Sequence, residues 1–219
     1  MMNPSWMFVA ECTRTLQNDD ALLSRVMAVA RDAADPVPLY RLANLCRRRG
    51  QLDLWHRGVE LAMELPHSTH EQIVRRAAAK LTRGEWVGWI DYEHRKLNPR
   101  FQVAPFEQHL HWTCPQWDGH GDSCYHTLLV IPEQGFGDVI QMLRFIPAVS
   151  GRASRVLFSV PDPLVSLVQH NYGQLVTVIP EGAPHGEPYD CYVSLMSLLV
   201  RHMLPPTCGP QVHTSPNPY

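Results

Sequence analysis

No stretch of this sequence stays apolar for the roughly 20 residues that a membrane-spanning helix needs. The N-terminal region also lacks the positively charged start and apolar core of a secretory signal. Net charge is nearly absent, at −2, which excludes the bulk basicity that is typical of nucleic-acid-binding proteins. We therefore expect a cytoplasmic protein with no membrane span and no nucleic-acid partner.

The six cysteines include no CxxC pair, so the sequence lacks a common signal of a metal or redox site. Scattered cysteines in a chain of 219 residues are typical of reduced thiols in the cytoplasm, and disulfide pairing has no particular spacing in its favour. Apolar residues, by contrast, are plentiful. They make up 45% of the chain, enough for packed cores in one large or two modest domains.

The clearest change of pattern lies within residues 127–149. The apolar run 128–131 predicts a buried strand, and the glycines Gly135 and Gly137 predict a tight reversal that uses positive φ. A helix is expected from Asp138. Such a turn lies at the carboxyl end of a strand, where open α/β sheets bind their ligands. The apolar residues at helical spacing are Val139, Met142, Leu143, Ile146 and Val149.

The region before residue 99 has helical periodicity. Residues 5–34 predict helix, and residues 35–66 predict a helix–turn–helix unit that turns at Gly50. A weaker unit follows at 70–99, and its Gly84 lies 34 residues after Gly50. That distance is the period of tetratricopeptide repeats, which both units resemble. The expected apolar faces comprise Leu39, Leu42, Ala43 and Cys46, then Leu52, Trp55, Val59 and Ala62, and in the second unit Trp86, Trp89, Ile90 and Tyr92.

Further apolar segments at 155–160, 175–179 and 189–199 alternate with helical patterns. This alternation predicts a parallel sheet with right-handed crossovers, so the expected fold class is α + α/β. The proline-rich end of the chain is expected to be irregular. The predicted domains are a helical region at 1–98, a connector at 99–126, an α/β domain at 127–204 and a tail at 205–219.

Three segments carry a family resemblance. EQGFGDVIQMLRFIP (133–147) is similar to a signature of tetratricopeptide-containing glycosyltransferase-like proteins, which are related to the heptosyltransferases. GEWVGWIDYEHR (84–95) resembles the segment that precedes the sugar-transferase part in that family, and PQWDG (115–119) resembles its P-x-WDG element. The resemblance implies tetratricopeptide-like hairpins followed by a Rossmann-like domain, the N-terminal, acceptor-side half of a GT-B fold.

The resemblance also implies that Asp138 is the base that deprotonates an acceptor hydroxyl. From the residues alone, Asp138 is also explained as a cap of its helix. The two nearby glycines are weak support for a phosphate site, because residue 140 is isoleucine where a dinucleotide fingerprint has glycine. The residues that the resemblance places on the acceptor side of the cleft are Glu133, Gln134, Gly135, Gly137 and Gln141.

The connector at 99–126 is rich in proline, histidine and tryptophan. Trp112 and Trp117 are expected to be packing anchors between the helical and α/β parts. The histidines and cysteines are numerous enough to bind one tetrahedral zinc ion. Their spacing matches no named zinc motif, however, and the resemblance implies none, so we predict no metal site. These residues are His109, His111, Cys114, His120, Cys124 and His126.

Two functions therefore compete. In the first, the protein transfers sugar from a nucleotide sugar, its only expected small-molecule requirement, to a protein or glycan hydroxyl. In the second, it is a non-catalytic scaffold or partner subunit of a glycosylation system, and its helical repeats bind a protein partner. A GT-B donor-binding domain has no counterpart within residues 1–219, so we expect the chain alone to bind nucleotide sugars weakly and not to transfer sugar.

Overall fold

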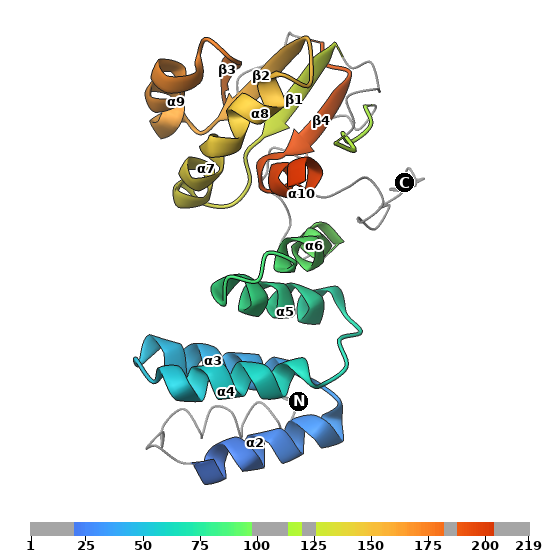
Figure 1. The fold of residues 1–219 in the computed structure, drawn as a ribbon, viewed down its shortest axis with the longest axis vertical. Helices are drawn as coiled ribbons and strands as arrows, with labels where there is room; N and C mark the ends of the chain where they lie inside the picture. Colours follow the sequence, from blue (N-terminus) through green and yellow to red (C-terminus); the bar gives the residue numbers. More distant parts are fainter. Residues whose placement is uncertain (1–19, 98–113, 120–125, 182–187, 204–219) are drawn as a thin grey trace. The chain divides into compact units, whose positions relative to one another are not determined.

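The computed structural model describes residues 20–97, 114–119, 126–181 and 188–203 (Figure 1). The chain divides into two compact units, residues 1–101 and 102–219. In the part of the chain described, the first unit is helical and the second contains a four-stranded parallel sheet. The prediction of a helical part followed by a parallel sheet is confirmed at this level. The expected helix before residue 20, most of the connector and the tail at 205–219 lie outside the described residues.

The helical unit consists of pairs of helices joined by short turns. No helix in the described residues is long and apolar enough to cross a membrane. The helix α5 begins with a capping box, in which Thr69 accepts a hydrogen bond from the Gln72 backbone and the Gln72 side chain accepts one from the Thr69 backbone. The elements are α2 (Asp20–Ala33), α3 (Val37–Arg48), α4 (Leu52–Met63), α5 (His70–Thr82), α6 (Gly88–Tyr92) and the 3₁₀ helix η1 (Glu93–Leu97).

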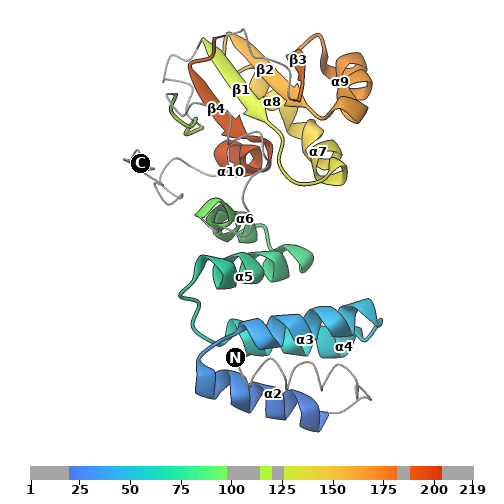
Figure 2. The same ribbon diagram turned by 180° about the vertical axis from the view of Figure 1, so that it is seen from behind.

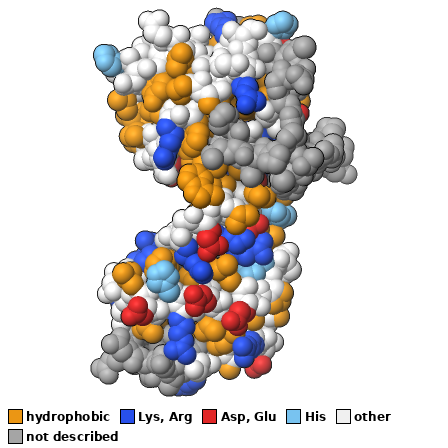
Figure 3. All heavy atoms as spheres, in the orientation of Figure 1, with side chains coloured by type: hydrophobic (Ala, Val, Ile, Leu, Met, Phe, Trp, Pro, Cys, Tyr) orange, Lys and Arg blue, Asp and Glu red, His pale blue; other side chains and the backbone are white. Residues whose placement is uncertain are grey.

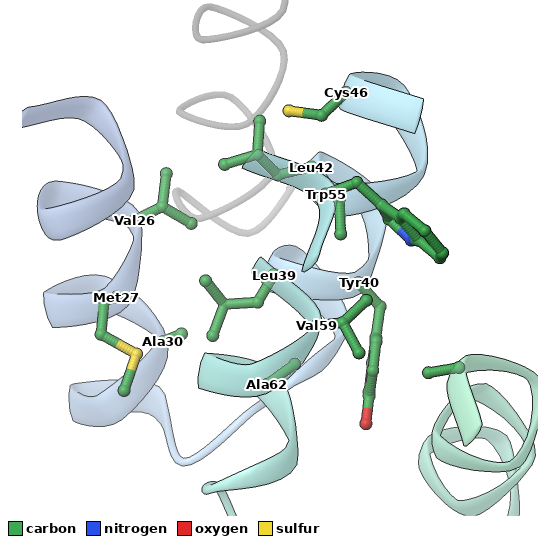
Figure 4. Close-up of a cluster of buried hydrophobic side chains, with 12 residues drawn as sticks. Val26, Met27, Ala30, Leu39, Tyr40, Leu42, Cys46, Trp55, Val59 and Ala62 are labelled. Carbon is green, nitrogen blue, oxygen red and sulfur yellow. The ribbon is translucent and has the colours of Figure 1, made fainter. Parts of the chain in front are cut away.

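The core of this unit forms where α2, α3 and α4 meet (Figure 4). The predicted apolar faces of α3 and α4 are buried, with one exception: Leu52, the first residue of α4, is 54% exposed. Trp86 was expected in the second hairpin's apolar face, but it lies in the turn before α6 and is 61% exposed. The buried residues drawn in Figure 4 include Val26, Met27, Ala30, Leu39, Tyr40, Leu42, Cys46, Trp55, Val59 and Ala62.

Both turn glycines that the sequence predicts adopt a left-handed backbone. Gly50 ends the α3–α4 turn with φ of 74°, and Gly84 follows α5 with φ of 80°. Residues with a Cβ rarely adopt this conformation. The two turns are therefore equivalent in position along the sequence and in backbone geometry.

Replacing Gly50 or Gly84 by alanine should lower the free energy of unfolding by about 1 kcal/mol at each site. A Cβ at either position would meet no atom within 4 Å, so the cost comes from φ alone. Gly137→Ala is the matched control, because its Cβ also enters open space while its φ is not positive. Urea denaturation followed by circular dichroism measures all three variants. Equal losses at the three sites would contradict this origin of the cost.

The second unit contains a parallel sheet in the order β3-β2-β1-β4. Its strands are β1 (Thr127–Ile131), β2 (Arg155–Val160), β3 (Thr177–Pro180) and β4 (Cys191–Ser194). Leu129 lies opposite Leu157 on β2 and opposite Tyr192 on β4, and these three side chains belong to one buried cluster. All four residues from Leu128 to Ile131 are buried, as expected for a strand covered on both faces.

Short helices connect the strands, and Figures 1 and 2 show α8 against one face of the sheet. The single helix that the sequence predicts from Asp138 to Val149 is interrupted instead. Pro147 lacks the N–H group that a continuous helix needs from it, so a new helix begins around it. The elements are α7 (Phe136–Met142), η4 (Leu143–Phe145), α8 (Ile146–Ser150), η5 (Asp162–Leu164), α9 (Val165–Tyr172), η6 (Leu195–Ser197) and α10 (Leu198–Met203).

Residues 114–119 lie beside β4, as both views show. Gln116 forms an isolated parallel bridge with Tyr192, and the Trp117 N–H donates to the Tyr192 carbonyl oxygen at 2.7 Å. The Trp117 side chain is only 2% exposed. The segment therefore pairs with the outer edge of β4 before the chain reaches β1. Trp112, the other expected anchor, lies outside the described residues.

Candidate functional site

The candidate site lies at the carboxyl edge of the sheet, between β1 and β4. The chain passes from β1 to β2 on one side, whereas β4 lies on the other side of β1. Parallel α/β sheets bind ligands where the strand order reverses in this way, outside the carboxyl ends of the strands. Two segments border this edge: residues 132–138 after β1, and residues 194–197 after β4.

The turn after β1 is built differently from the sequence prediction. Neither Gly135 nor Gly137 has positive φ; the left-handed residue is Gln134, with φ of 68°. Gly135 has ordinary extended backbone, with φ of −88° and ψ of 169°, and is the N-cap of α7. The expected location of the reversal was therefore wrong by one residue. A non-glycine residue at positive φ costs energy and persists only where its surroundings hold it.

Asp138 lies at the third position of α7 and is half-buried. Its Oδ2 accepts a hydrogen bond from the Gly135 N–H at 3.2 Å. The helix cap that the sequence offered as the alternative role is therefore present. This bond occupies one of the two carboxylate oxygens, and no hydrogen bond joins Oδ1 to another described residue. Capping and proton transfer can therefore use different oxygens of the same side chain.

Glu133 is buried rather than open to a ligand, with 3% of its surface exposed. Its Oε1 accepts a hydrogen bond from the Ser194 hydroxyl and another from the Met196 N–H, the latter at 3.1 Å. These contacts join the segment after β1 to the segment after β4. Ser194 was not predicted as a site residue, although a serine that ends an apolar strand was a usable signal.

The other predicted site residues lie on the exposed side of this turn. Gln134, Gly135 and Gly137 are exposed, and so is Gln141, which lies one helical turn after Asp138. Large apolar side chains accompany them, because Phe136 and Ile140 on α7 are about half exposed. The structure thus brings together the five predicted residues other than Glu133, whose carboxylate faces the interior.

No group of three or more His, Cys, Asp or Glu side chains that could hold a metal ion occurs among the described residues. Of the connector's candidate ligands, Cys114 donates from its thiol to the Tyr189 carbonyl oxygen, and His126 is exposed. The other four candidates, His109, His111, His120 and Cys124, lie outside the described residues.

Charged clusters in the helical unit are already paired. Glu93 accepts from Arg95 at 2.8 Å through Oε1 and from Lys96 at 3.0 Å through Oε2. Asp91 accepts from two basic side chains of α5, at 2.9 and 3.0 Å. Such closed clusters stabilise helix contacts and leave little capacity for a ligand, so the candidate site belongs to the α/β unit.

No family model, curated protein or solved structure matches this sequence. The class that the structure defines is therefore a helical unit joined to a parallel α/β unit. Such a fold does not define a function by itself, so the function depends on the residues at the carboxyl edge of the sheet.

Proposed function

We propose that the edge between β1 and β4 is the acceptor side of a sugar-transfer site in a glycosyltransferase-like protein. The observation that carries the proposal is Asp138, half-buried in the first turn of α7 and directly beyond the strand at which the sheet order reverses. The strand order 3-2-1-4 agrees with a Rossmann-like half of a GT-B fold. The three resembling segments at 84–95, 115–119 and 133–147 add independent support.

In this proposal Asp138 is the general base. Its carboxylate takes the proton of an acceptor hydroxyl while that oxygen attacks the anomeric carbon of a nucleotide sugar. The bond from the anomeric carbon to the diphosphate breaks, and the nucleotide diphosphate leaves with the electron pair. Gln134 and Gln141 carry amide groups that can hydrogen-bond to sugar hydroxyls, and exposed Gly135 and Gly137 allow close approach.

Charge at the edge favours a neutral acceptor over a diphosphate. Residues 132–142 and 194–200 contain two carboxylates, Glu133 and Asp138, and neither lysine nor arginine. A diphosphate near these carboxylates is repelled unless cations elsewhere compensate. In the proposed site this edge binds the hydroxyl acceptor, and the donor's phosphates are held by other groups.

A neutral trisaccharide should shift the amide NMR signals of Gly135, Asp138 and Gln141 in the 219-residue protein. Chitotriose and maltotriose are suitable probes. UDP-, GDP- and ADP-sugars should bind more weakly than about 1 mM in calorimetry, because residues 132–142 and 194–200 offer the diphosphate no lysine or arginine. Asp138→Asn should reduce the response to the trisaccharide, whereas Asp162→Asn, which changes an exposed carboxylate of the same unit, should not.

Two outcomes would count against this proposal. Micromolar binding of a nucleotide sugar, with turnover abolished by Asp138→Asn, would refute the charge argument and make the chain a self-sufficient enzyme. If no trisaccharide affects the signals of residues 135–141, the acceptor site is wrong and the scaffold function is favoured.

The scaffold function has one specific observation in its favour. Trp86 is 61% exposed and Val87 is 52% exposed, side by side in the turn before α6. Exposed tryptophan is common at protein interfaces. Figure 3 shows basic, acidic and hydrophobic side chains interspersed on one face of the helical unit. The trisaccharide titration separates the two functions, since a scaffold that binds a protein through its hairpins requires no response at Asp138.

A further inference from the structure

We infer that Glu133 is a positioning residue, which holds Asp138 in place by fastening the turn after β1 to the segment after β4. The inference rests on the role proposed above for Asp138. It departs from the sequence-based expectation that Glu133 contacts the acceptor. Glu133 is 3% exposed, and its Oε1 already accepts hydrogen bonds from Ser194 and Met196.

The hydrogen bonds to Glu133 connect segments that are far apart in the sequence. Glu133 and Ser194 are 61 residues apart in sequence, and their strands are neighbours in the sheet. Ser194 is fully buried, so its hydroxyl is shielded from water. Hydrogen bonds to a buried carboxylate are stronger than those between neutral groups, and their loss leaves buried donors without a partner.

The strained residue lies directly after the fastened one. Gln134 has φ of 68°, and in the described residues only Ala34 is another non-glycine residue with positive φ. Ala34 directly follows α2, where left-handed residues commonly terminate helices. Gln134 instead precedes a helix. Its strain has to be held from both sides: by Glu133 before it, and by the bond between Gly135 and Asp138 after it.

Releasing Glu133 should therefore free the turn as a whole. Once Gln134 relaxes, the Gly135 N–H no longer faces the Asp138 carboxylate, and Asp138 loses its fixed orientation. A residue that only stabilises the fold would weaken the sheet and the turn equally. A positioning residue affects the turn selectively, although the two hydrogen bonds to the Glu133 Oε1 come from Ser194 and Met196 and not from the turn itself.

Amide hydrogen exchange by NMR in the full chain separates these two roles. In Glu133→Leu, exchange at Met196 should rise about ten- to a hundredfold, because its acceptor is gone. Exchange at Gly135 should rise by about tenfold or more, while Leu157 and Phe158 in β2 keep their rates. Glu133→Gln should restore slow exchange at Gly135 to within a few-fold, because the amide oxygen of glutamine can still accept both bonds.

Two further variants keep the inference falsifiable if Glu133→Leu does not fold. Ser194→Ala removes one of the two donors to Glu133 and should raise the amide exchange rate of Gly135 several-fold. Ser159→Ala is the matched control. The Ser159 hydroxyl is buried in β2 and has no hydrogen-bond partner among the described residues, so the amide exchange rate of Gly135 should stay unchanged.

The inference is overturned if the amide exchange rate of Gly135 is unchanged in both Ser194→Ala and Glu133→Leu. It is also overturned if the amide exchange rates in β2 rise by the same factor as the rate at Gly135. These measurements need no ligand. Failure of the trisaccharide titration would therefore refute the proposed function, whereas failure of the exchange pattern would refute the positioning role of Glu133.

Discussion

Replacing Glu93 by glutamine should lower the free energy of unfolding of the helical unit by roughly 3–5 kcal/mol. Glu93 is 5% exposed and Arg95 is 2% exposed, so both charges are buried. The Glu93 carboxylate accepts from Arg95 at 2.8 Å and from Lys96 at 3.0 Å. Glutamine removes the negative charge that opposes the buried Arg95 guanidinium, which costs far more than one hydrogen bond. Urea denaturation of the variant measures the loss.

The matched control is Glu71→Gln. Glu71 pairs with Arg75 at 2.7 Å on α5, but both side chains are about a quarter exposed. Pairs of this kind, one helical turn apart, contribute only about 0.2–0.5 kcal/mol. A loss at Glu93 no larger than the loss at Glu71 would show that the Glu93 pair is solvated in solution.

The same ion pair predicts a dependence on pH. Burial by itself raises the pKa of the Glu93 carboxyl, but the nearby Lys96 and Arg95 outweigh burial and hold this pKa at about 2 instead of 4.5. The unfolded state therefore takes up the proton first as the pH falls. The contribution of roughly 3 kcal/mol is fully present above pH 4.5 and is lost between pH 4.5 and about 2. The difference in stability between wild type and Glu93→Gln should close over that interval.

The features that the sequence predicts well depend on local rules. Gly50 and Gly84 follow helices and take positive φ, because each turn needs a residue without a Cβ. The strand at 128–131 is a continuous apolar run, as expected for a strand buried on both faces. The helix interruption at Pro147 also follows a local rule, which the helical spacing of the surrounding apolar residues obscured.

The features that the sequence does not reveal depend on contacts between distant segments. Glu133 accepts from Ser194, and no spacing or periodicity links residues 61 positions apart. The left-handed conformation of Gln134 is likewise imposed from outside, because glutamine has no preference for it and the glycine beside it does not use it. Burial of Glu93 and Arg95 was missed because charged residues in a segment such as YEHRK usually face solvent.

The candidate site combines features that the sequence predicts with features that depend on contacts between distant segments. Gly135, Gly137 and Asp138 were predicted at the edge of the sheet from one strand–turn–helix pattern, and the family resemblance added Gln134. These residues lie in the turn after β1 and the first turn of α7. The other border of the edge, after β4, was not predicted, because the sequence does not state which strand lies beside β1. Strand order is decided by the packing of the whole sheet.

Gly119→Ala should lower the free energy of unfolding of the α/β unit by roughly 2–5 kcal/mol. Gly119 has φ of 97°, and a Cβ on it would lie 2.6 Å from the Arg201 carbonyl oxygen and 3.1 Å from the Arg201 Cβ. The left-handed backbone costs about 1–2 kcal/mol for an L-residue. Relief of the collision requires a backbone shift, which typically adds about 1–3 kcal/mol.

The shift should reach the edge of the sheet, because Gly119 ends the segment that pairs with β4. Tyr192 donates its N–H to the Pro115 carbonyl oxygen at 3.2 Å, so displacement of this segment leaves that strand edge open. Amide exchange at Tyr192 should therefore rise more than exchange at Leu157 in β2. Gly151→Ala is the matched control: its φ is −83° and its Cβ would meet no atom within 4 Å, so stability should change by less than about 0.5 kcal/mol. If Gly119→Ala behaves like Gly151→Ala, residues 114–119 are not packed against β4 and α10 in solution, because only that packing brings the Arg201 backbone close enough to exclude a methyl group.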